Sequence, residues 1–352
     1  MNLLFLYTEI AGYFIASAET LFKEYGYEVH IITKPVNPEA PYIFPEYEGI
    51  TFYQRNKMSS DDIFALFEKL TPKFVYISGW GDKTYMQVAP KIRKLGIPVI
   101  CSCDNQWKGN LRQLVAGFVR RKYLRRRFSH IFIAGTYQYP LAVHLGFKKR
   151  QVLMGMNTAD LSIFHKAYND FLESKTKNYP HNFLYVGRFV EIKGLEELVA
   201  SFIELVEEVN HDWTLTLVGA GYLKSKLPNH NQIIYKDFVQ QKKLPALAGA
   251  SGCFVLPSRI EPWGVVLHEF AGAGLPLIVS NVCGASTAFL RPGYNGFMHE
   301  PESKKEIKKA LLKIIRKKDK ELLEMGKRSH LLSYHMTKES WASTLLSTVE
   351  PV

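Results

Sequence analysis

Short β-forming runs alternate with helical stretches along most of this chain, and this alternation limits the folds open to it. The first half contains the runs NLLFLYT, EVHIIT, FVYIS, PVICSC, HIFIAG and VLMGM, with helical patterns at 15–25, 61–70 and 86–94. Strands that alternate with helices in this way form βαβ units around a parallel sheet. The first half therefore predicts one Rossmann-like domain.

The same alternation restarts after residue 180, with NFLYVG, WTLTLVG, QIIYKDFV, CFVLP and PLIVS as the β-forming runs. The polar segment KAYNDFLESKTKNYP before it lacks clear periodicity, so we place an interdomain linker at 166–180. We predict an N-terminal domain at 1–165, a C-terminal Rossmann-like domain at 181–325, and a helical segment at 326–352 that packs back on the N-terminal domain. A chain of 352 residues is also long for a single hydrophobic core.

The apolar run at the N-terminus stops at Thr8, well short of a signal peptide or a membrane span. The cysteines match neither a disulfide ladder nor a zinc quartet; they are Cys101, Cys103, Cys253 and Cys283. We therefore expect a cytoplasmic protein with reduced thiols.

The net charge of +12 indicates an anionic partner, which could be a nucleotide, a phospholipid surface or a nucleic acid. Residues 1–170 contain 22 Lys and Arg against 14 Asp and Glu, a net charge of +8. The N-terminal half is therefore the half expected to meet a charged surface.

The stretch PSRIEPWGVVLHE, residues 257–269, predicts a strand end, a turn and the start of a helix. The first backbone N–H groups of a helix lack intrahelical partners and lie at the positive end of its dipole, so they suit a diphosphate. Gly264 would allow a close approach of the ligand to the backbone.

Glu269 lies four residues after Val265, so its side chain projects on the face of the free amides. A carboxylate there can accept hydrogen bonds from both hydroxyls of a ribose, and Glu261 in the turn can accept from sugar hydroxyls. The alternative is that both acids only stabilise the start of the helix. The pair, with Pro-Trp-Gly between, favours the ligand site.

The pattern E-P-W-G-x-x-x-x-E resembles the E-x7-E motif of retaining glycosyltransferase family 4, the glycosyl transferases group 1. Further shared motifs run through the C-terminal half: GR with KG at 187–194, VGxG at 218–221, LPAL at 244–247, PS at 257–258, GxP at 274–276 and NG at 295–296. The resemblance implies the α/β GT-B fold, in which two Rossmann-like domains face each other across a cleft. It also implies a hexosyltransferase-type enzyme that uses a nucleotide-sugar such as a UDP-sugar as substrate, with no cofactor and no metal.

Residue by residue, the resemblance implies that Arg188 and Lys193 bind the diphosphate and that Glu269 holds the ribose. It implies further that Glu261 and the backbone from Trp263 to Val266 hold the donor sugar and the phosphates. The position of the two cations agrees, because they follow the run FLYVG at a strand end, where a parallel sheet binds its ligands.

Gly219 and Gly221 follow a strand and begin a dinucleotide-binding pattern, but Lys224 stands where its third glycine would be. A nicotinamide enzyme is therefore disfavoured. We interpret Gly219 as part of a tight turn near the nucleotide base, and we include Phe238 among the predicted donor contacts.

The N-terminal half departs from the family pattern. Of the family's glycine pair after the first strand only Gly12 remains, and of a His-Asp pair only Asp104 remains, after Cys103. Asp104 is the candidate for contact with the transferred sugar or the acceptor, and an acid that caps a turn is the alternative. Ala288 stands where relatives have a glutamate, so the contribution of that loop stays open.

An apolar stripe at helical spacing over 111–119 precedes the basic run RRKYLRRR at 120–127. This pattern is typical of an amphipathic helix on an anionic membrane. A stripe that faces the core, with a solvated basic end, is the alternative. Nucleic acid is disfavoured, because no stacking aromatic residues alternate with the basic ones and no nucleic-acid motif occurs.

These features predict transfer of a sugar to a saccharide or lipid-linked saccharide, as in surface polysaccharide or glycoconjugate biosynthesis, with a peripheral position on the inner face of the cell membrane. The alternative is a non-catalytic nucleotide-sugar-binding partner of an active glycosyltransferase. The missing histidine and Ala288 favour that alternative, whereas Arg188, Lys193 and the two glutamates favour the enzyme.

Overall fold

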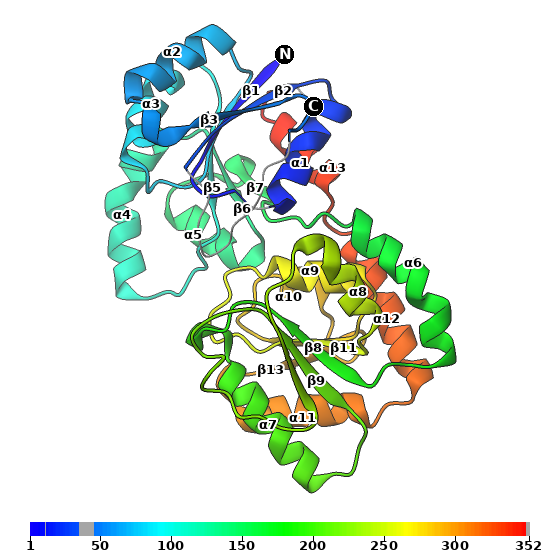
Figure 1. Cartoon of the computed structure of the whole chain (residues 1–352). Helices are drawn as coiled ribbons and strands as arrows, with labels where there is room; N and C mark the ends of the chain where they lie inside the picture. Colours follow the sequence, from blue (N-terminus) through cyan, green and yellow to red (C-terminus); the bar gives the residue numbers. More distant parts are fainter. Residues whose placement is uncertain (11, 35–45, 350–352) are drawn as a thin grey trace. The chain divides into compact units, whose positions relative to one another are not determined.

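A computed structural model of the chain describes residues 1–10, 12–34 and 46–349, which divide into two compact units (Figure 1). Unit 1 comprises Met1–Thr158 and Met336–Val352, and unit 2 comprises Ala159–His335. In each unit helices pack on a parallel β-sheet, so the two predicted Rossmann-like domains are confirmed.

In its described residues unit 1 has a seven-stranded parallel sheet of order β3-β2-β1-β4-β5-β6-β7. The strands are β1 (Asn2–Tyr7), β2 (Glu28–Thr33), β3 (Ile50–Gln54), β4 (Val75–Ile77), β5 (Val99–Cys103), β6 (His130–Ile133) and β7 (Val152–Met154). The helices are α1 (Gly12–Lys23), α2 (Ser60–Leu70), α3 (Lys83–Lys94), α4 (Leu111–Arg125), α5 (Tyr139–His144) and α13 (Lys338–Leu346). Strand β3 is not predicted from the sequence. Its run ITFYQ is only partly buried in the structure, so it lacks a clear apolar pattern.

In its described residues unit 2 has a six-stranded parallel sheet of order β10-β9-β8-β11-β12-β13. The strands are β8 (Asn182–Val186), β9 (Thr214–Val218), β10 (Ile233–Lys236), β11 (Cys253–Leu256), β12 (Leu277–Ser280) and β13 (Gly296–His299). The helices are α6 (Ser162–Lys177), α7 (Leu195–Glu208), α8 (Leu244–Gly249), α9 (Val265–Gly272), α10 (Ser286–Phe289), α11 (Lys304–Ile315) and α12 (Asp319–Ser333).

The linker predicted at 166–180 is wrong, because most of it forms the helix α6 of unit 2. Phe164 and Ala167 bury one face of this helix. Lys175 is buried too, and its Nζ donates to the carbonyl oxygens of Ala248 (2.7 Å) and Ser251 (2.8 Å) at the end of α8. A polar composition thus concealed a helix whose buried lysine is held by carbonyl oxygens at the end of α8.

The predicted domain boundaries also need correction. Residues 326–335, assigned to the C-terminal segment, belong to unit 2 through α12, and unit 2 already begins at Ala159. The packing of the last segment on the N-terminal domain is seen for α13. Trp341 of α13 is buried in the core beside β1 and α1, and its Nε1 donates to the carbonyl oxygen of Met156 at 3.0 Å.

Within the described ranges no helix combines the length and the apolar character needed to cross a lipid bilayer.

His268 of α9 is fully buried, and it connects three segments of unit 2. Its Nδ1 accepts from the backbone N–H of Ala159 (3.2 Å), and its Nε2 donates to the carbonyl oxygen of Ser333 (2.9 Å). Burial lowers the pKa of His268 to about 3, and the hydrogen bond to Ser333 opposes this effect only in part. The imidazole therefore stays neutral when unit 2 is folded.

We expect acid to destabilise unit 2 through His268. A histidine whose pKa falls on folding contributes stability that is complete above the unfolded pKa of about 6.5 and is lost as the pH falls toward the folded pKa. By pH 5 this loss is about 2 kcal/mol. Urea denaturation should show a smaller decrease in stability between neutral pH and pH ~5 for His268→Gln, which cannot be protonated, than for the wild type.

His181→Gln is the matched control. Burial alone would lower the pKa of His181, but hydrogen bonds with Asp319 and Asp212 raise it overall. Its contribution is therefore present below the unfolded pKa and lost as the pH rises through the folded pKa. His181→Gln should lose most stability in acid, and an unchanged pH dependence in His268→Gln would contradict the role of His268.

Candidate active site

The strand order of unit 2 brings two loops together. The order reverses between β8 and β11, which are hydrogen-bonded neighbours although β9 and β10 lie between them in the sequence. Parallel α/β sheets bind ligands at such a switch point, at the carboxyl edge beside the loops that follow the two strands. We call this place in unit 2 the crevice. Here these loops are 187–194 after β8 and 257–264 after β11.

The two loops are in close backbone contact. Gly194 ends the first loop with φ of 67°, and a Cβ atom there would lie 2.3 Å from the carbonyl oxygen of Pro257. Only glycine satisfies both requirements. The backbone of Arg259 adds a hydrogen bond from its N–H to the carbonyl oxygen of Ile192, at 2.9 Å.

An ion pair joins the same loops through residues predicted from the sequence. Lys193 Nζ lies 2.5 Å from Oε2 of Glu261, and the hydroxyl of Ser258 donates to the same oxygen at 3.0 Å. Both charged side chains are largely buried, with exposed fractions of 15% for Lys193 and 9% for Glu261. The cation predicted for the phosphates and the acid predicted for the sugar thus lie side by side and neutralise each other.

Arg259 is a residue that the sequence analysis did not assign. Its guanidinium forms ion pairs with Glu191 (3.0 Å), Glu196 (3.5 Å) and Glu197, which lie on the loop after β8 and in the first turn of α7. The Arg259 side chain is only 18% exposed. Two features of the sequence could have indicated these ion pairs: Arg259 stands in the PSR stretch beside Glu261, and three acids lie near Lys193.

Arg188 has a different environment from Lys193. Its side chain is exposed at the end of β8. Within the described part of the chain it forms no ion pair, while its carbonyl oxygen accepts from the hydroxyl of Tyr185 at 2.9 Å. The guanidinium is therefore available to a charged ligand at this edge.

Helix α9 begins at the same crevice. Gly264 precedes it with φ of 95°, and a Cβ atom there would lie 3.0 Å from Sγ of Cys283. The N–H groups of Val265 and Val266 belong to the first turn, where no preceding helical carbonyl exists. They can donate to an anion, as predicted.

Trp263 has a structural side chain. It is buried, 3% exposed, with its ring edge-on to Phe289 at 6.3 Å between centroids. Its carbonyl oxygen accepts from the backbone N–H of Ala285 at 2.9 Å. The contribution of Trp263 to the crevice is therefore limited to its backbone, the part of it that the resemblance assigns to the donor.

Glu269 is a buried acid, 7% exposed, on α9. Burial raises its pKa to about 7; a hydrogen bond from Gln241 opposes this, and the charge of Asp160 adds to it. Gln241 Nε2 donates to Oε1 of Glu269 at 2.8 Å. Gln241 follows β10 and was not predicted from the sequence, because an isolated glutamine carries no local signal.

Two further predicted residues lie on neighbouring loops of the same edge. Gly219 follows β9 with φ of 151°, and a Cβ atom there would lie 1.9 Å from the carbonyl oxygen of Gly187, so it supports the loop that carries Arg188. Phe238 follows β10 and is 55% exposed. The place of Gly219 near the nucleotide base and the contact of Phe238 with the donor stay predictions.

The predicted residues of the N-terminal half lie at the carboxyl edge of the sheet of unit 1. Gly12 is the first residue of α1, after β1. Asp104 follows β5, its side chain is exposed, and its carbonyl oxygen accepts from Gln138 Nε2 at 3.0 Å. Burial raises the pKa of the preceding Cys103 to about 12, so its thiol stays protonated. The role of Asp104 stays a prediction.

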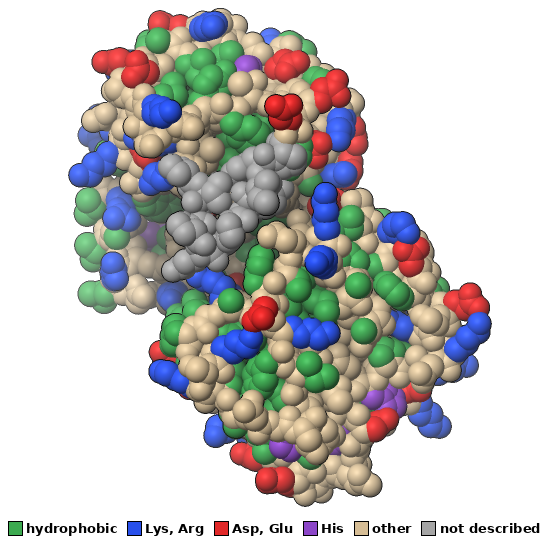
Figure 2. All heavy atoms as spheres, viewed as in Figure 1, with side chains coloured by type: hydrophobic (Ala, Val, Ile, Leu, Met, Phe, Trp, Pro, Cys, Tyr) green, Lys and Arg blue, Asp and Glu red, His purple; other side chains and the backbone are tan. Residues whose placement is uncertain are grey.

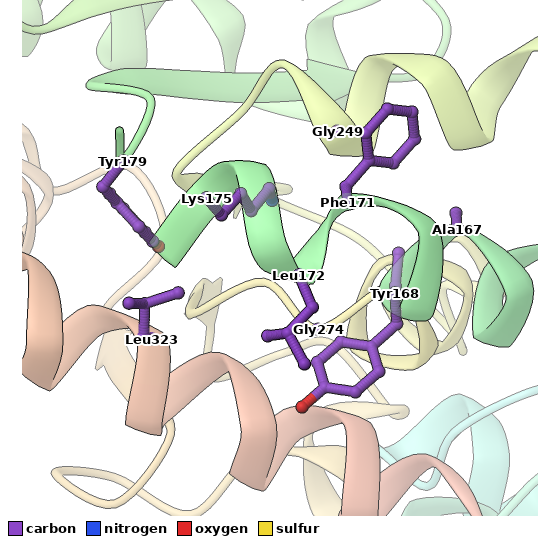
Figure 3. Close-up of a pocket in the computed structure, with 10 residues that line it drawn as sticks. Ala167, Tyr168, Phe171, Leu172, Lys175, Tyr179, Gly249, Gly274 and Leu323 are labelled. Atoms are coloured by element: carbon purple, nitrogen blue, oxygen red, sulfur yellow. The ribbon is translucent and has the colours of Figure 1, made fainter. Parts of the chain in front are cut away.

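A small cavity elsewhere in unit 2 is not part of this crevice (Figure 3). It lies among α6, α8 and α12, is lined by Tyr168, Phe171, Leu172 and Lys175 with neighbours, and has a volume of about 10 Å³. That volume suits about one water molecule, so the cavity is a packing defect rather than a substrate site.

Residues 169–331 match the family model described as glycosyl transferases group 1. A curated relative, the glycogen synthase of Mycobacterium tuberculosis, is 30% identical over 149 residues, which are 39% of this chain and 36% of that protein. An uncharacterised 41.2 kDa protein in the cps region of Klebsiella pneumoniae is 26% identical over 46% of this chain and 45% of its own length. The chain thus matches less than half the length of these relatives.

Solved structures resemble the whole chain. A sucrose-phosphate synthase from Thermosynechococcus elongatus has a TM-score of 0.72 and 17% identity, over 99% of this chain and 97% of its own. Anabaena HepE in complex with UDP-glucose has a TM-score of 0.69 and 13% identity, over 99% of this chain and 100% of its own. At this identity the likeness concerns the fold, and it confirms the α/β fold class predicted as GT-B.

The ion pair between the two loops should contribute strongly to the stability of unit 2. Lys193→Met should lower the free energy of unfolding by about 3 kcal/mol, because the carboxylate of Glu261 then stays buried without its cation. The double variant Lys193→Met/Glu261→Gln should recover most of this loss, as measured by urea denaturation.

Lys320→Met is the matched control, since Lys320 is exposed on α12 and forms no ion pair in the described part of the chain. The free energy of unfolding of this variant should equal that of the wild type. Strictly additive effects of the two substitutions in the double variant would contradict the coupling.

Proposed function

We propose that this protein transfers a sugar from a nucleoside-diphosphate sugar to a saccharide or lipid-linked saccharide acceptor. The proposal proceeds from the match of residues 169–331 to the family model of glycosyl transferases group 1. The observation that supports it most is a single crevice in unit 2. There the first turn of α9, two cations and a buried glutamate lie at the carboxyl edge where β8 and β11 adjoin.

The parts of this crevice match the parts of a nucleotide-sugar. The amides of Val265 and Val266, with Arg188 and Lys193, would hold the diphosphate. Glu269 would accept hydrogen bonds from the ribose hydroxyls, with Gln241 holding its carboxylate in place. Related folds support UDP as the nucleotide, because the HepE structure contains UDP-glucose.

A bound donor would weaken the ion pair between Lys193 and Glu261 and give each side chain a separate role. A diphosphate that approaches Lys193 replaces part of its interaction with Glu261, and the Glu261 carboxylate, still bonded to Ser258, can then accept from the donor sugar. Lys193 and Arg188 would stabilise the negative charge that develops on the departing nucleotide. We propose on this basis a retaining, hexosyltransferase-type, metal-independent enzyme, in which the cations take the role of a divalent ion.

The acceptor belongs, in this proposal, to unit 1 and to the edge that carries Gly12 and Asp104. A lipid-linked saccharide at the inner face of the cell membrane is supported by the net charge of +12. A pathway of polysaccharide biosynthesis is supported by the similarity to a glycogen synthase and to a protein of a cps region.

Removal of Lys193 should abolish most of the reaction. With UDP-glucose as donor probe, Lys193→Ala should reduce release of UDP by about 100-fold, since it removes a charge aimed at the leaving group. Lys320→Ala, an exposed lysine on α12, should leave the rate unchanged. Donor cleavage is measured as the amount of UDP formed, with and without an added saccharide. GDP-glucose and ADP-glucose are tested as alternative donors in the same assay.

The same assay separates the enzyme from a non-catalytic nucleotide-sugar-binding partner. Thermal stabilisation by a nucleotide-sugar without any UDP, GDP or ADP release would support the non-catalytic partner, which the missing histidine and Ala288 favour. Release that persists unchanged in Lys193→Ala would contradict the assignment of the site.

Donor binding should strengthen as the pH rises. Burial raises the pKa of Glu269 to about 7, and only its ionised form accepts from both ribose hydroxyls. From pH ~6 to ~8 the affinity for UDP-glucose should rise by up to about tenfold, in step with the ionised fraction. Calorimetric titration measures it, and Glu269→Gln should bind more weakly with no such pH dependence. A pH-dependent rise that persists in Glu269→Gln would exclude this glutamate as its source.

A further inference from the structure

The surface of unit 1 has one helix that faces outward with apolar residues. In α4 the buried residues are Gly117 and Leu124, which are seven positions apart and so lie on one face. The opposite face carries residues exposed by 59% to 78%, namely Leu111, Val115, Phe118 and Val119. The alternative that the stripe faces the core is therefore wrong.

Helix α4 is anchored by its inner face. His144 of α5 lies against Gly117, where a Cβ atom would be 2.1 Å from the His144 ring, and its Nε2 lies 2.9 Å from the carbonyl oxygen of Leu114. Asn110 caps the start of the helix by accepting from the N–H of Gln113 at 2.9 Å. The outward apolar face is thus presented by a held helix rather than by a loose segment.

The charge around α4 is uniformly positive. Residues 105–159 contain 11 Lys and Arg and no Asp or Glu, which is nearly the whole net charge of +12. Six of these cations are exposed on α4 and its end without an ion pair in the described residues: Arg112, Arg120, Arg121, Lys122, Arg125 and Arg126. Lys122 and Arg126 continue the apolar face beyond Val119. Figure 2 shows hydrophobic and basic side chains interleaved at this edge of unit 1.

Arg127 differs from these cations. Its guanidinium stacks on Tyr123 at 3.5 Å, and its Nε donates to the carbonyl oxygen of Met86 at 3.0 Å. It therefore fastens the end of α4 to α3 and is not available to a partner. The outward cations and the anchoring cation are distinct sets.

We propose that the outward face of α4 docks on an anionic phospholipid membrane. Four large apolar side chains need a partner that removes them from water, and the flanking cations need one that is negatively charged. A bilayer with anionic headgroups offers both at once, with the helix lying in the plane of the interface. A nucleic acid offers the charge without an apolar layer. The inference extends the proposed membrane location by naming the surface.

The position of α4 gives this docking a use in the proposed reaction. The helix begins seven residues after Asp104, on the chain that leaves the carboxyl end of β5. Membrane contact through α4 would therefore bring the edge that carries Asp104 close to the headgroup layer. An acceptor whose lipid part stays in the bilayer would present its saccharide at that level.

Sedimentation of the full chain with vesicles tests the proposal without using transfer. The wild type should bind vesicles of equal parts phosphatidylglycerol and phosphatidylcholine, release on addition of salt, and fail to bind vesicles of phosphatidylcholine alone. Phe118→Ser/Val119→Ser and Arg125→Gln/Arg126→Gln should each reduce binding at least about tenfold, since both apolar and ionic contacts contribute.

Matched controls come from unit 2. Lys304→Gln/Lys305→Gln removes the same charge from the start of α11, and Leu331→Ser removes an apolar side chain of α12 that is 56% exposed. Both should bind vesicles like the wild type. All variants should bind UDP-glucose and give the circular dichroism spectrum of the wild type. A loss of vesicle binding can then be distinguished from a loss of the fold or of the donor site. Equal loss in the control variants, or no loss in the α4 variants, would overturn the proposal, as would equal binding to neutral vesicles.

Discussion

The adjacency of β8 and β11 is the constraint on which the candidate site depends. Because these strands are neighbours while their loops belong to segments about 70 residues apart, residues of the two loops form one site only if the loops approach closely. Gly194 permits that approach against Pro257, and the Lys193–Glu261 and Arg259 ion pairs hold it. Arg259 thereby acts as a positioning residue for Lys193, through Glu191 and Glu197.

The charged side chains of the crevice lie in two different environments. Lys193 and Glu261 form an ion pair in which the two largely buried charges compensate each other, since each alone would be costly to bury. Among the described residues Glu269 forms no ion pair, and its burial raises its pKa to about 7. Two acids eight residues apart in one motif therefore differ in their electrostatic environment. Glu261 is paired with a cation, whereas the protonation of Glu269 can change when a ligand binds.

Particular errors show where sequence patterns misled. The polar residues of α6 favour a linker at 166–180. They include Lys175, which is in fact buried and donates to carbonyls of its own unit. Gln241 and Arg259 escaped assignment because their partners are distant in the sequence. In each case the deciding contact is made by residues that no local pattern connects.

The sequence by itself determined the two parallel α/β domains and pointed to the candidate residues of the C-terminal half, because strand and helix periodicity and the Glu-Pro-Trp-Gly turn are local properties. It left the stripe at 111–119 with two interpretations, since a helical apolar pattern is the same whether it faces a core or a solvent. The tertiary structure decided that question, because Gly117 and Leu124 occupy the inward face and leave Phe118 and Val119 outside. It also decided the ion-pair partner of Lys193 and the hydrogen-bond partner of Glu269, since those depend on which strands of the sheet adjoin.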